Sequence, residues 1–534
     1  MTGRVHTQRY LLFMAGLLLA LCLAGCGAPG GGDGPAGYPA GDQAVATTPP
    51  RRPTPTNAPP DLATETSAQP ATATPAPTGN LREVTVLYTN DEHGWMEGME
   101  PGRGAANLLG LWQANGYNPA TTLIISGGDM WTGPAISTWF EGESMVEVMN
   151  AMGYAAAAVG NHEFDFGLTA LQARAAQANF PLLSANIRDV SSGAIPAGLG
   201  IQPYTLVTVN GVQVGLIGLT TTSTPRTTNP SNVAGFEFID YETALRETVP
   251  EVRAAGAQLI LVPAHICQAE AERLARQVSD LGLAMVGGGH CNELFAKEIE
   301  GTVVLEGGYH LTSYAAVTFQ YDLAADAVVD VAYDVTANQP TGVPDPAVTA
   351  IVQRWRARVE GELNEVIGYS EAGLARRGPE MQALVTEAWL ASYPADVAIT
   401  NLGGFRADLP AGAITLDAIV TVLPFNNTIV EVEVTGAQLL DVLSFAEAAV
   451  GGASRQRGEW VLHDGTAIDP AGSYTLLVND FMYAGGDGYE MLAEYDPAAY
   501  NTAIDWRQPL IDWIKAQNSS ADNPIDAAIA ALVR

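Results

Sequence analysis

Short apolar runs that end abruptly in polar or glycine-rich loops dominate the chain from Val84 onward. The runs VTVLYT, TLIIS and AAAAVG stop at NDEHG, GGDMWTG and NHEFDFG, and VGLIGLT, LILVPAH and AMVGGGH alternate with amphipathic stretches such as 270–281. Runs of this length predict buried strands, and their alternation with helices predicts an α/β fold. Polar residues then gather after the strands, where open α/β sheets bind ligands.

A change of pattern divides the folded part into two non-equivalent domains. YAAVTFQYDL and VVDVAYDV alternate as in a sheet with one exposed face, and the polar helical segment DPAVTAIVQRWRARVEGEL follows them. Helix and strand patterns then resume with other motifs, and we find no internal repeat. We predict a first domain over 81–340, a connector helix over 341–365 and a second domain over 366–534.

The first 80 residues carry signals for export rather than for a core. Two arginines precede a short apolar run that ends in Leu23-Ala24-Gly25-Cys26, which predicts a signal peptide over 1–25. The run is short for a membrane span. The segment 26–80 is rich in Pro, Thr, Ala and Gly, which predicts a disordered tether.

Charge and cysteine usage limit the ligands and the compartment. The net charge of −33 argues against nucleic acid polymers as partners, because phosphate backbones bind basic surfaces. An anionic ligand must therefore meet metal ions or a few arginines. Outside the signal segment only Cys267 and Cys291 remain. An oxidising compartment would permit them to pair, and the sequence leaves this open.

The strand-end loops hold a mixed set of metal ligands. Their imidazole, carboxylate and amide groups suit Mn, Zn, Fe or Mg, and the set exceeds one tetrahedral site. Phosphoester cleavage gains from two ions about 3.5–4 Å apart. We therefore predict two divalent ions per chain, near Asp91, His93, Asp129, Asn161, His162, His265, His290 and Asn292.

In order and content these fragments resemble the calcineurin-like metallophosphatases. The resemblance rests on Asp91-Glu92-His93, Gly128-Asp129, Gly160-Asn161-His162-Glu163, His265 and Gly289-His290. It implies that Asp91, His93 and Asn292 serve one metal, that Asn161, His265 and His290 serve the other, and that Asp129 bridges them. Asn292 stands where family members more often have Gln or His. The same resemblance implies a catalytic pair, His162 and Asp165. Glu163 is interpreted as structural, and His310 matches no motif position.

The second domain resembles the C-terminal domain of 5′-nucleotidases. The motifs are NLGGFR at 401–406, PFNN at 424–427 and AGGDGYE at 484–490, with Phe481 just before the last. The resemblance implies that two phenylalanines sandwich the base, an Asp meets the ribose and arginines contact phosphate. The implied substrate-binding residues are Arg377, Asn401, Arg406, Phe425, Asn427, Phe481 and Asp487.

Together these resemblances imply a sandwich of two sheets flanked by helices, followed by an α/β nucleotide-binding domain. The expected activity is release of phosphate from nucleoside 5′-monophosphates by metal-activated water. Alternatives on the same scaffold are a UDP-sugar or dinucleotide pyrophosphatase, a 2′,3′-cyclic-nucleotide phosphodiesterase, a sulfur-ester hydrolase and, more distantly, a non-catalytic surface binding protein. The end of the signal resembles a bacterial lipobox. It implies lipidation at Cys26, attachment to the outer face of a membrane through that anchor alone, and a location at the cell surface or in the periplasm.

Overall fold

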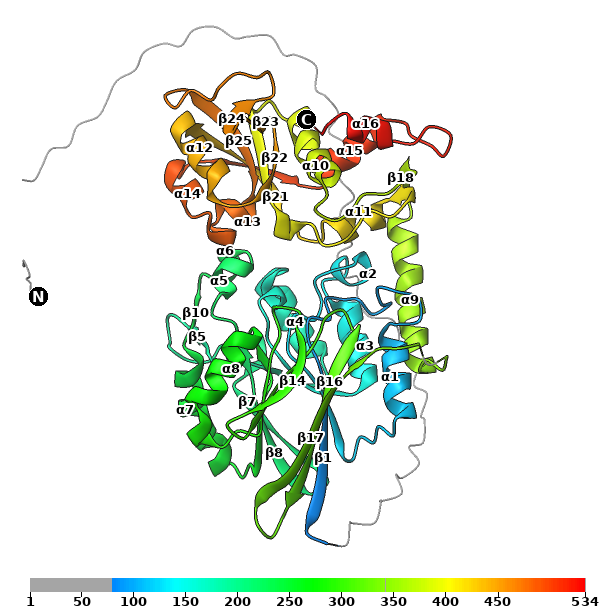
Figure 1. Ribbon diagram of the computed structural model, residues 1–534, viewed down its shortest axis with the longest axis vertical. Coiled ribbons are helices and arrows are strands. Elements are labelled where there is room, and N and C mark those ends of the chain that lie inside the picture. The colour runs from blue at the N-terminus through cyan, green and yellow to red at the C-terminus, as the bar shows by residue number, and fades with distance from the viewer. Residues whose placement is uncertain (1–78, 341, 534) are drawn as a thin grey trace, which may run out of the picture. The chain divides into compact units, whose positions relative to one another are not determined.

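The computed structural model describes residues 79–340 and 342–533 (Figure 1). The predicted signal peptide, the lipidation at Cys26 and nearly all of the predicted tether lie outside the described residues. In the described part of the chain, no helix combines the length and the apolar character that a bilayer crossing requires.

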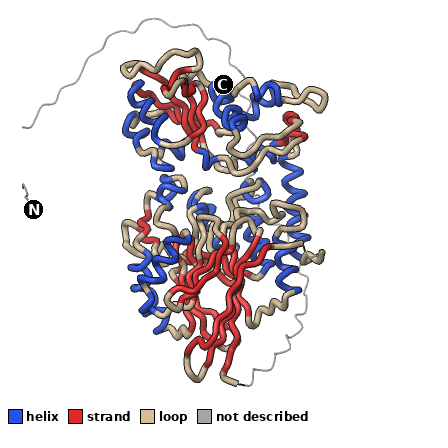
Figure 2. Tube along the Cα trace, in the orientation of Figure 1, coloured by secondary structure: helices blue, strands red, loops and turns tan. Residues whose placement is uncertain are grey.

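Two sheets form the first half of the described chain, and Figure 2 shows their strands as a central block with helices beside it. The seven-stranded sheet has the order β17 (Ala327–Ala337), β16 (Ser313–Asp322), β1 (Leu81–Thr89), β2 (Thr122–Ser126), β3 (Tyr154–Ala158), β4 (Leu182–Leu183) and β6 (Ile201–Gln202). The six-stranded sheet has the order β14 (Leu294–Ile299), β15 (Thr302–Gly307), β13 (Met285–Gly287), β11 (Leu259–Val262), β8 (Val212–Ile217) and β7 (Tyr204–Val209).

The two sheets pack face to face because their central strands are apolar on both sides. One core cluster joins Val86 and Ile125 of the first sheet to Leu216 and Leu261 of the second. The outer face of the seven-stranded sheet is covered by α1 (Ala105–Ala114), α3 (Glu143–Met152) and α4 (Gly167–Gln177). The outer face of the six-stranded sheet is covered by α7 (Tyr241–Ala254) and α8 (Gln268–Gln277). The predicted sandwich of two sheets flanked by helices is confirmed.

A long helix, α9 (Pro346–Leu363), follows the sandwich. Asp345 caps it by accepting hydrogen bonds from the backbone N–H groups of Ala347 and Val348, which is the start signal that an Asp-Pro pair gives. Trp355 is buried on the helix layer of the first sheet. Arg356 forms ion pairs with Glu97 and Asp417, so it links residues from both halves of the chain.

The second half is built on a five-stranded sheet with the order β22 (Ala448–Gly451), β19 (Val397–Asn401), β25 (Ser473–Asn479), β21 (Thr428–Thr435) and β26 (Tyr500–Asp505). One face is covered by α10 (Pro379–Ser392), α11 (Leu416–Val422), α15 (Gln508–Ala516) and α16 (Asp526–Ala530). The other is covered by α12 (Gly436–Phe445), α13 (Asp480–Tyr483) and α14 (Met491–Tyr495). This mixed architecture agrees with the predicted α/β class.

Two-stranded sheets and short helices lie between these elements. The pairs are β5 (Ile187–Asp189) with β10 (Phe236–Phe238), β9 (Leu219–Thr220) with β12 (Ala264–His265), β18 (Val366–Ser370) with β20 (Gly412–Thr415), and β23 (Ala453–Gln456) with β24 (Glu459–Leu462). The short helices near the site are α2 (Ala135–Thr138), α5 (Thr224–Thr227) and α6 (Pro230–Val233).

Candidate active site

The predicted metal ligands gather where parallel strands of both sheets end. Strands β1, β2 and β3 run parallel, so the loops after them bring Asp91, Asp129 and Asn161 to one edge. His265 comes from β12, which follows β11 of the other sheet and pairs with β9, and His290 comes from the loop after β13 of that sheet. The ligand atoms of Asp129, His265 and His290 lie within 4.8 Å of one another, as do those of His93, Asp129 and His162.

Most of these ligands lie on unusual backbone. Asp91, His93, Asp129, His290 and Asn292 all have positive φ angles, between 46° and 75°. Residues other than glycine adopt this left-handed conformation at a cost, and it persists where the surroundings impose it, often at functional sites. Regular strand or helix geometry would aim these side chains elsewhere, so the strained loops are what turns them toward a common centre.

Backbone carbonyls fix how the two buried imidazoles face the centre. His93 donates from Nδ1 to the carbonyl oxygen of Thr132 at 2.8 Å. His265 donates from Nδ1 to the carbonyl oxygen of Gly127 at 2.9 Å. In each ring Nδ1 then carries a proton and faces a carbonyl, so Nε2 faces the centre, which is the orientation that metal-binding histidines need.

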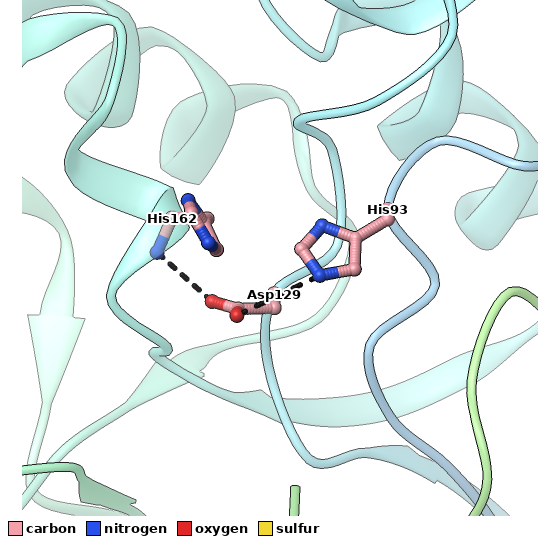
Figure 3. A group of neighbouring side chains, drawn as sticks. All are labelled: His93, Asp129 and His162. Atoms are coloured by element: carbon pink, nitrogen blue, oxygen red, sulfur yellow. Dashed lines mark hydrogen bonds and ion pairs between the residues drawn. The ribbon is translucent and has the colours of Figure 1, made fainter. Parts of the chain in front are cut away.

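Asp129 lies in the middle of the cluster, and Figure 3 shows it between the rings of His93 and His162. Its Oδ2 is 2.9 Å from Nε2 of His265 and 3.9 Å from Nε2 of His93. A Cβ atom on Gly160 would lie 2.2 Å from Oδ1 of Asp129. The glycine before Asn161 is therefore required for the loop to pass this close to the carboxylate.

Asn161 offers a buried acceptor to the same centre. Its amide nitrogen donates to the carbonyl of Thr227 at 3.0 Å. Its Oδ1 is buried, and no described residue hydrogen-bonds to it. A buried amide oxygen without a hydrogen-bond partner destabilises the folded state, so a ligand that binds its free lone pair is expected. A divalent ion fits this position.

The charges of the cluster also call for cations. Burial raises the pKa of Asp91 to about 6, with a further increase from Asp129 and an opposing effect of His265. Burial alone would lower the pKa of His265, but the neighbouring carboxylates outweigh it and raise that pKa to about 10. Buried carboxylates this close together are stabilised by positive charge. The oxygen and nitrogen donors present therefore fit hard or borderline divalent ions.

His162 and Asp165 form a close pair beside this cluster. His162 Nδ1 lies 2.7 Å from Oδ2 of Asp165, and Thr228 donates its hydroxyl to the other carboxylate oxygen at 2.9 Å. Burial lowers the pKa of His162, but Asp165 and Asp129 outweigh it and raise the pKa above its ordinary value. Since Nδ1 faces the carboxylate, Nε2 is the ring atom that can donate to a substrate.

Glu163 has the structural position that the sequence suggested. Its carboxylate accepts hydrogen bonds from the backbone N–H groups of Asp129, Met130 and Gly160 at 2.6–2.9 Å. These bonds tie the loop after β2 to the loop after β3. Glu163 thereby holds two ligand-bearing loops in register without facing the centre itself.

One cavity of about 240 Å³ joins the predicted metal ligands to predicted nucleotide-binding residues. It is lined by Asp91, His93, Asp129, Asn161, His162, Asp165, His290 and Asn292 from the first half, and by Asn401, Arg406, Phe425, Asn427, Phe481 and Asp487 from the second. His265 is fully buried beneath this surface. The structure thus brings together nearly all of the residues that the sequence proposed.

Local contacts position the groups on the second side of the cavity. Asn401 donates its amide to Oδ2 of Asp487 at 2.7 Å, and Asn479 in turn donates to Oδ1 of Asn401 at 3.0 Å. A Cβ atom on Gly486 would lie 2.4 Å from the ring of Phe481, so this glycine makes room for the ring. The ring of Phe425 stacks on His162 with centroids 5.8 Å apart.

Arg377 is the predicted substrate-binding residue that does not line the 240 Å³ cavity. Together with Arg376 and Arg406 it lines a second cavity of about 890 Å³, which also contains Trp95 and His310. Arg406 lines both cavities, and its guanidinium is 3.3 Å from Nε2 of His93. His310, to which the sequence gave no role, stacks on Trp95 with centroids 5.0 Å apart. No motif marked Trp95 or His310, so their positions are visible only in the fold.

The pairing that the sequence left open is present: Cys267 and Cys291 form a disulfide, with Cα atoms 5.1 Å apart. Each cysteine is close in sequence to a predicted metal ligand. Cys267 follows His265 by two residues, and Cys291 stands between His290 and Asn292. The bond therefore joins two of the loops that carry the ligands.

Comparisons with known proteins agree with this arrangement. Residues 366–461 match the family model of the 5′-nucleotidase C-terminal domain. A trifunctional nucleotide phosphoesterase of Bacillus subtilis is 28% identical, over 78% of this chain and 33% of the relative, so the chain spans about a third of that protein. A 5′-nucleotidase of Vibrio parahaemolyticus is 27% identical, over 83% of this chain and 90% of the relative. The crystal structure of a 5′-nucleotidase precursor from Thermus thermophilus matches with a TM-score of 0.70 at 24% identity. The match covers 82% of this chain and 97% of the Thermus chain, and it supports the fold.

Proposed function

We propose that the chain, which belongs to the 5′-nucleotidase family, hydrolyses phosphoric ester bonds and releases phosphate from nucleoside 5′-monophosphates outside the cytoplasmic membrane. The observation that carries the proposal is the single cavity in which the cluster around Asp129 and the rings of Phe425 and Phe481 meet. The Cys267–Cys291 disulfide supports the location, because disulfides persist in oxidising compartments. Lipidation of Cys26 would hold the protein at the outer face of a membrane.

Two divalent ions, held as the resemblance implies, would bind phosphate oxygens and lower the pKa of water for attack on phosphorus. Asp91, His93 and Asn292 would hold one ion, and Asn161, His265 and His290 the other, with Asp129 between them. The free Oδ1 of Asn161 and the Nε2 atoms of His93 and His265 support this assignment.

In this proposal His162 stabilises negative charge on the phosphoryl group. Asp165 holds the ring through Nδ1 and favours its protonated form, so Nε2–H donates to a phosphoryl or leaving-group oxygen. A positioned donor in a site that excludes water contributes most where charge develops in the transition state. The stacking of Phe425 on the same ring places the base-binding side of the cavity next to this donor.

The second half of the chain would recognise the nucleotide. Phe425 and Phe481 offer aromatic faces for the base, which any base can use. Asp487, oriented by Asn401, would accept hydrogen bonds from the ribose hydroxyls. Asn427 would contact the base edge. Arg406 would bind phosphate oxygens, since its planar guanidinium matches them in a bidentate manner.

The second cavity favours one alternative substrate class. Arg376, Arg377 and Arg406 form no ion pair with a carboxylate within the described residues, and Trp95 adds an aromatic surface beside them. A nucleotide with a further group beyond its scissile phosphate, such as a UDP-sugar or a dinucleotide, would have room there for that group. A 2′,3′-cyclic nucleotide has no such further group, so the second cavity does not support it as a substrate.

Phosphate release by the full chain tests the proposal. The substrates are AMP, UMP, UDP-glucose, 2′,3′-cyclic AMP and glycerol phosphate, each with Mn²⁺ or with EDTA. The proposal expects the 5′-monophosphates to be cleaved fastest and EDTA to abolish the reaction. Faster cleavage of UDP-glucose would select the alternative, and faster cleavage of glycerol phosphate would refute nucleotide recognition. A surface binding protein would release no phosphate from any of them.

A further inference from the structure

The Cys267–Cys291 disulfide holds together two segments that carry proposed metal ligands. On one side, Cys267 is the first residue before α8, and its backbone carbonyl accepts from the N–H of Glu270 at 3.0 Å. Helix α8 is anchored in the core through the buried Leu274. On the other side, Cys291 lies in an exposed loop. The bond therefore connects a fixed helix end to an exposed loop.

Hydrogen bonds hold the loop on both sides of Cys291 and Asn292: the N–H of Gly289 donates to the carbonyl of Ile266 at 3.0 Å, and the N–H of Gln268 donates to the Glu293 carboxylate at 2.9 Å. His290 and Asn292, on either side of the cysteine, have φ angles of +75° and +60°. Backbone of this kind persists only where the surroundings enforce it. The N–H of His290 donates to Asp91 at 2.9 Å, but in the described part of the chain neither Cys291 nor Asn292 forms a hydrogen bond. Asn292 is also exposed.

We propose that this disulfide is a positioning clamp for the metal centre, holding His290 and Asn292 at the distance from His265 at which two ions bind. The inference rests on the proposed metal site and deepens it. Neither sulfur contacts an ion or a substrate in this account. Without the bond, His290 and Asn292 would relax toward ordinary backbone conformations, and each binding event would have to impose the strained loop again. Metal affinity should then fall, while the chemistry of the loaded site should not change.

The test measures Mn²⁺ affinity rather than activity alone. The full chain and the double variant Cys267→Ala/Cys291→Ala are stripped with EDTA, freed of chelator and titrated with Mn²⁺ in a calorimeter. We expect the variant to bind Mn²⁺ about 10- to 100-fold more weakly, as when the outer contacts of metal ligands are removed. We also expect its kcat to return to the wild-type value at saturating Mn²⁺.

A matched control separates positioning from general stability. Val432→Ala removes buried methyl groups from β21, in the other half of the chain, and should lower Tm without weakening Mn²⁺ binding. If the cysteine variant loses Tm but binds Mn²⁺ as tightly as wild type, the disulfide is merely structural and the inference is wrong. If wild type itself binds no Mn²⁺, the proposed function is wrong, and the inference with it.

A second measurement covers the case in which the double variant does not fold. The folded wild-type chain is treated with a water-soluble phosphine, which takes oxygen from water and leaves two thiols in place of the exposed disulfide. Circular dichroism verifies that the fold remains. A 10- to 100-fold weaker Mn²⁺ affinity that recovers on reoxidation supports the clamp. Unchanged affinity after complete reduction overturns it.

Discussion

Replacing Asp165 by Asn tests the role of the proposed catalytic pair, His162 and Asp165, most sharply. The substitution keeps the size of the side chain and removes its charge, which lies 2.7 Å from Nδ1 of His162. A hydrogen bond to a charged group contributes about 1.5–3 kcal/mol. If that stabilisation of the protonated ring is expressed in the transition state, kcat should fall roughly 10- to 150-fold, since about 1.4 kcal/mol corresponds to tenfold. His162→Ala should cost about 10²- to 10⁴-fold.

The assay is steady-state phosphate release from AMP at saturating Mn²⁺, with kcat and KM determined separately. Thr228→Val is the matched control, because Thr228 donates to the far oxygen of Asp165. Its loss leaves the charge of Asp165 and the contact with His162 in place, so kcat should fall less than in Asp165→Asn. A kcat for Asp165→Asn within about threefold of wild type would refute the reasoning. So would a change confined to KM, because the pair would then act in binding rather than in the transition state.

Three further predictions concern recognition and stability. Phe425→Ala should reduce kcat/KM for AMP about 5- to 150-fold more than that for glycerol phosphate, because base stacking contributes roughly 1–3 kcal/mol; equal losses on both substrates would contradict base binding. Asp487→Ala should reduce kcat/KM for AMP about tenfold or more and leave that for the 2′,3′-dideoxy analogue unchanged; equal losses would exclude a ribose contact. Burial raises the pKa of Glu306 from 4.5 to about 9, so its carboxyl group stays protonated in the folded chain while the unfolded chain ionises. Wild type should therefore lose stability relative to Glu306→Gln as pH rises from about 4.5 to about 9, by at most about 1.4 kcal/mol per pH unit. Urea unfolding of both proteins at pH 5.5 and pH 8 measures the difference in their free energies of unfolding. If that difference is the same at both pH values, Glu306 ionises normally.

The sequence predicted the site residues that lie within its recognisable motifs. Asp91, Asp129 and His162 come directly after apolar strands, and parallel strands bring such residues to one edge. Their convergence therefore followed from local pattern and general topology. The α/β class followed in the same way, because buried strands and amphipathic helices differ in period. The two-sheet sandwich did not follow from local pattern and was implied by the family resemblance.

What the sequence did not reveal depends on contacts between distant residues. The carbonyl oxygens of Thr132 and Gly127 orient His93 and His265. Every residue has a backbone carbonyl, so the residue types do not reveal which one accepts such a hydrogen bond. Thr228 reaches Asp165 across 63 positions of sequence. The disulfide stayed open because two cysteines give no information on distance until the loops are placed. His310 became part of the second cavity only through the fold.

The most direct test of the central claim is the rate of phosphate release from AMP relative to glycerol phosphate by the full chain, with Mn²⁺ and with EDTA. The account predicts that AMP is cleaved much faster, that EDTA stops both reactions and that added Mn²⁺ restores them. Equal rates on the two esters, or release that continues in EDTA, would contradict a metal-dependent nucleotidase.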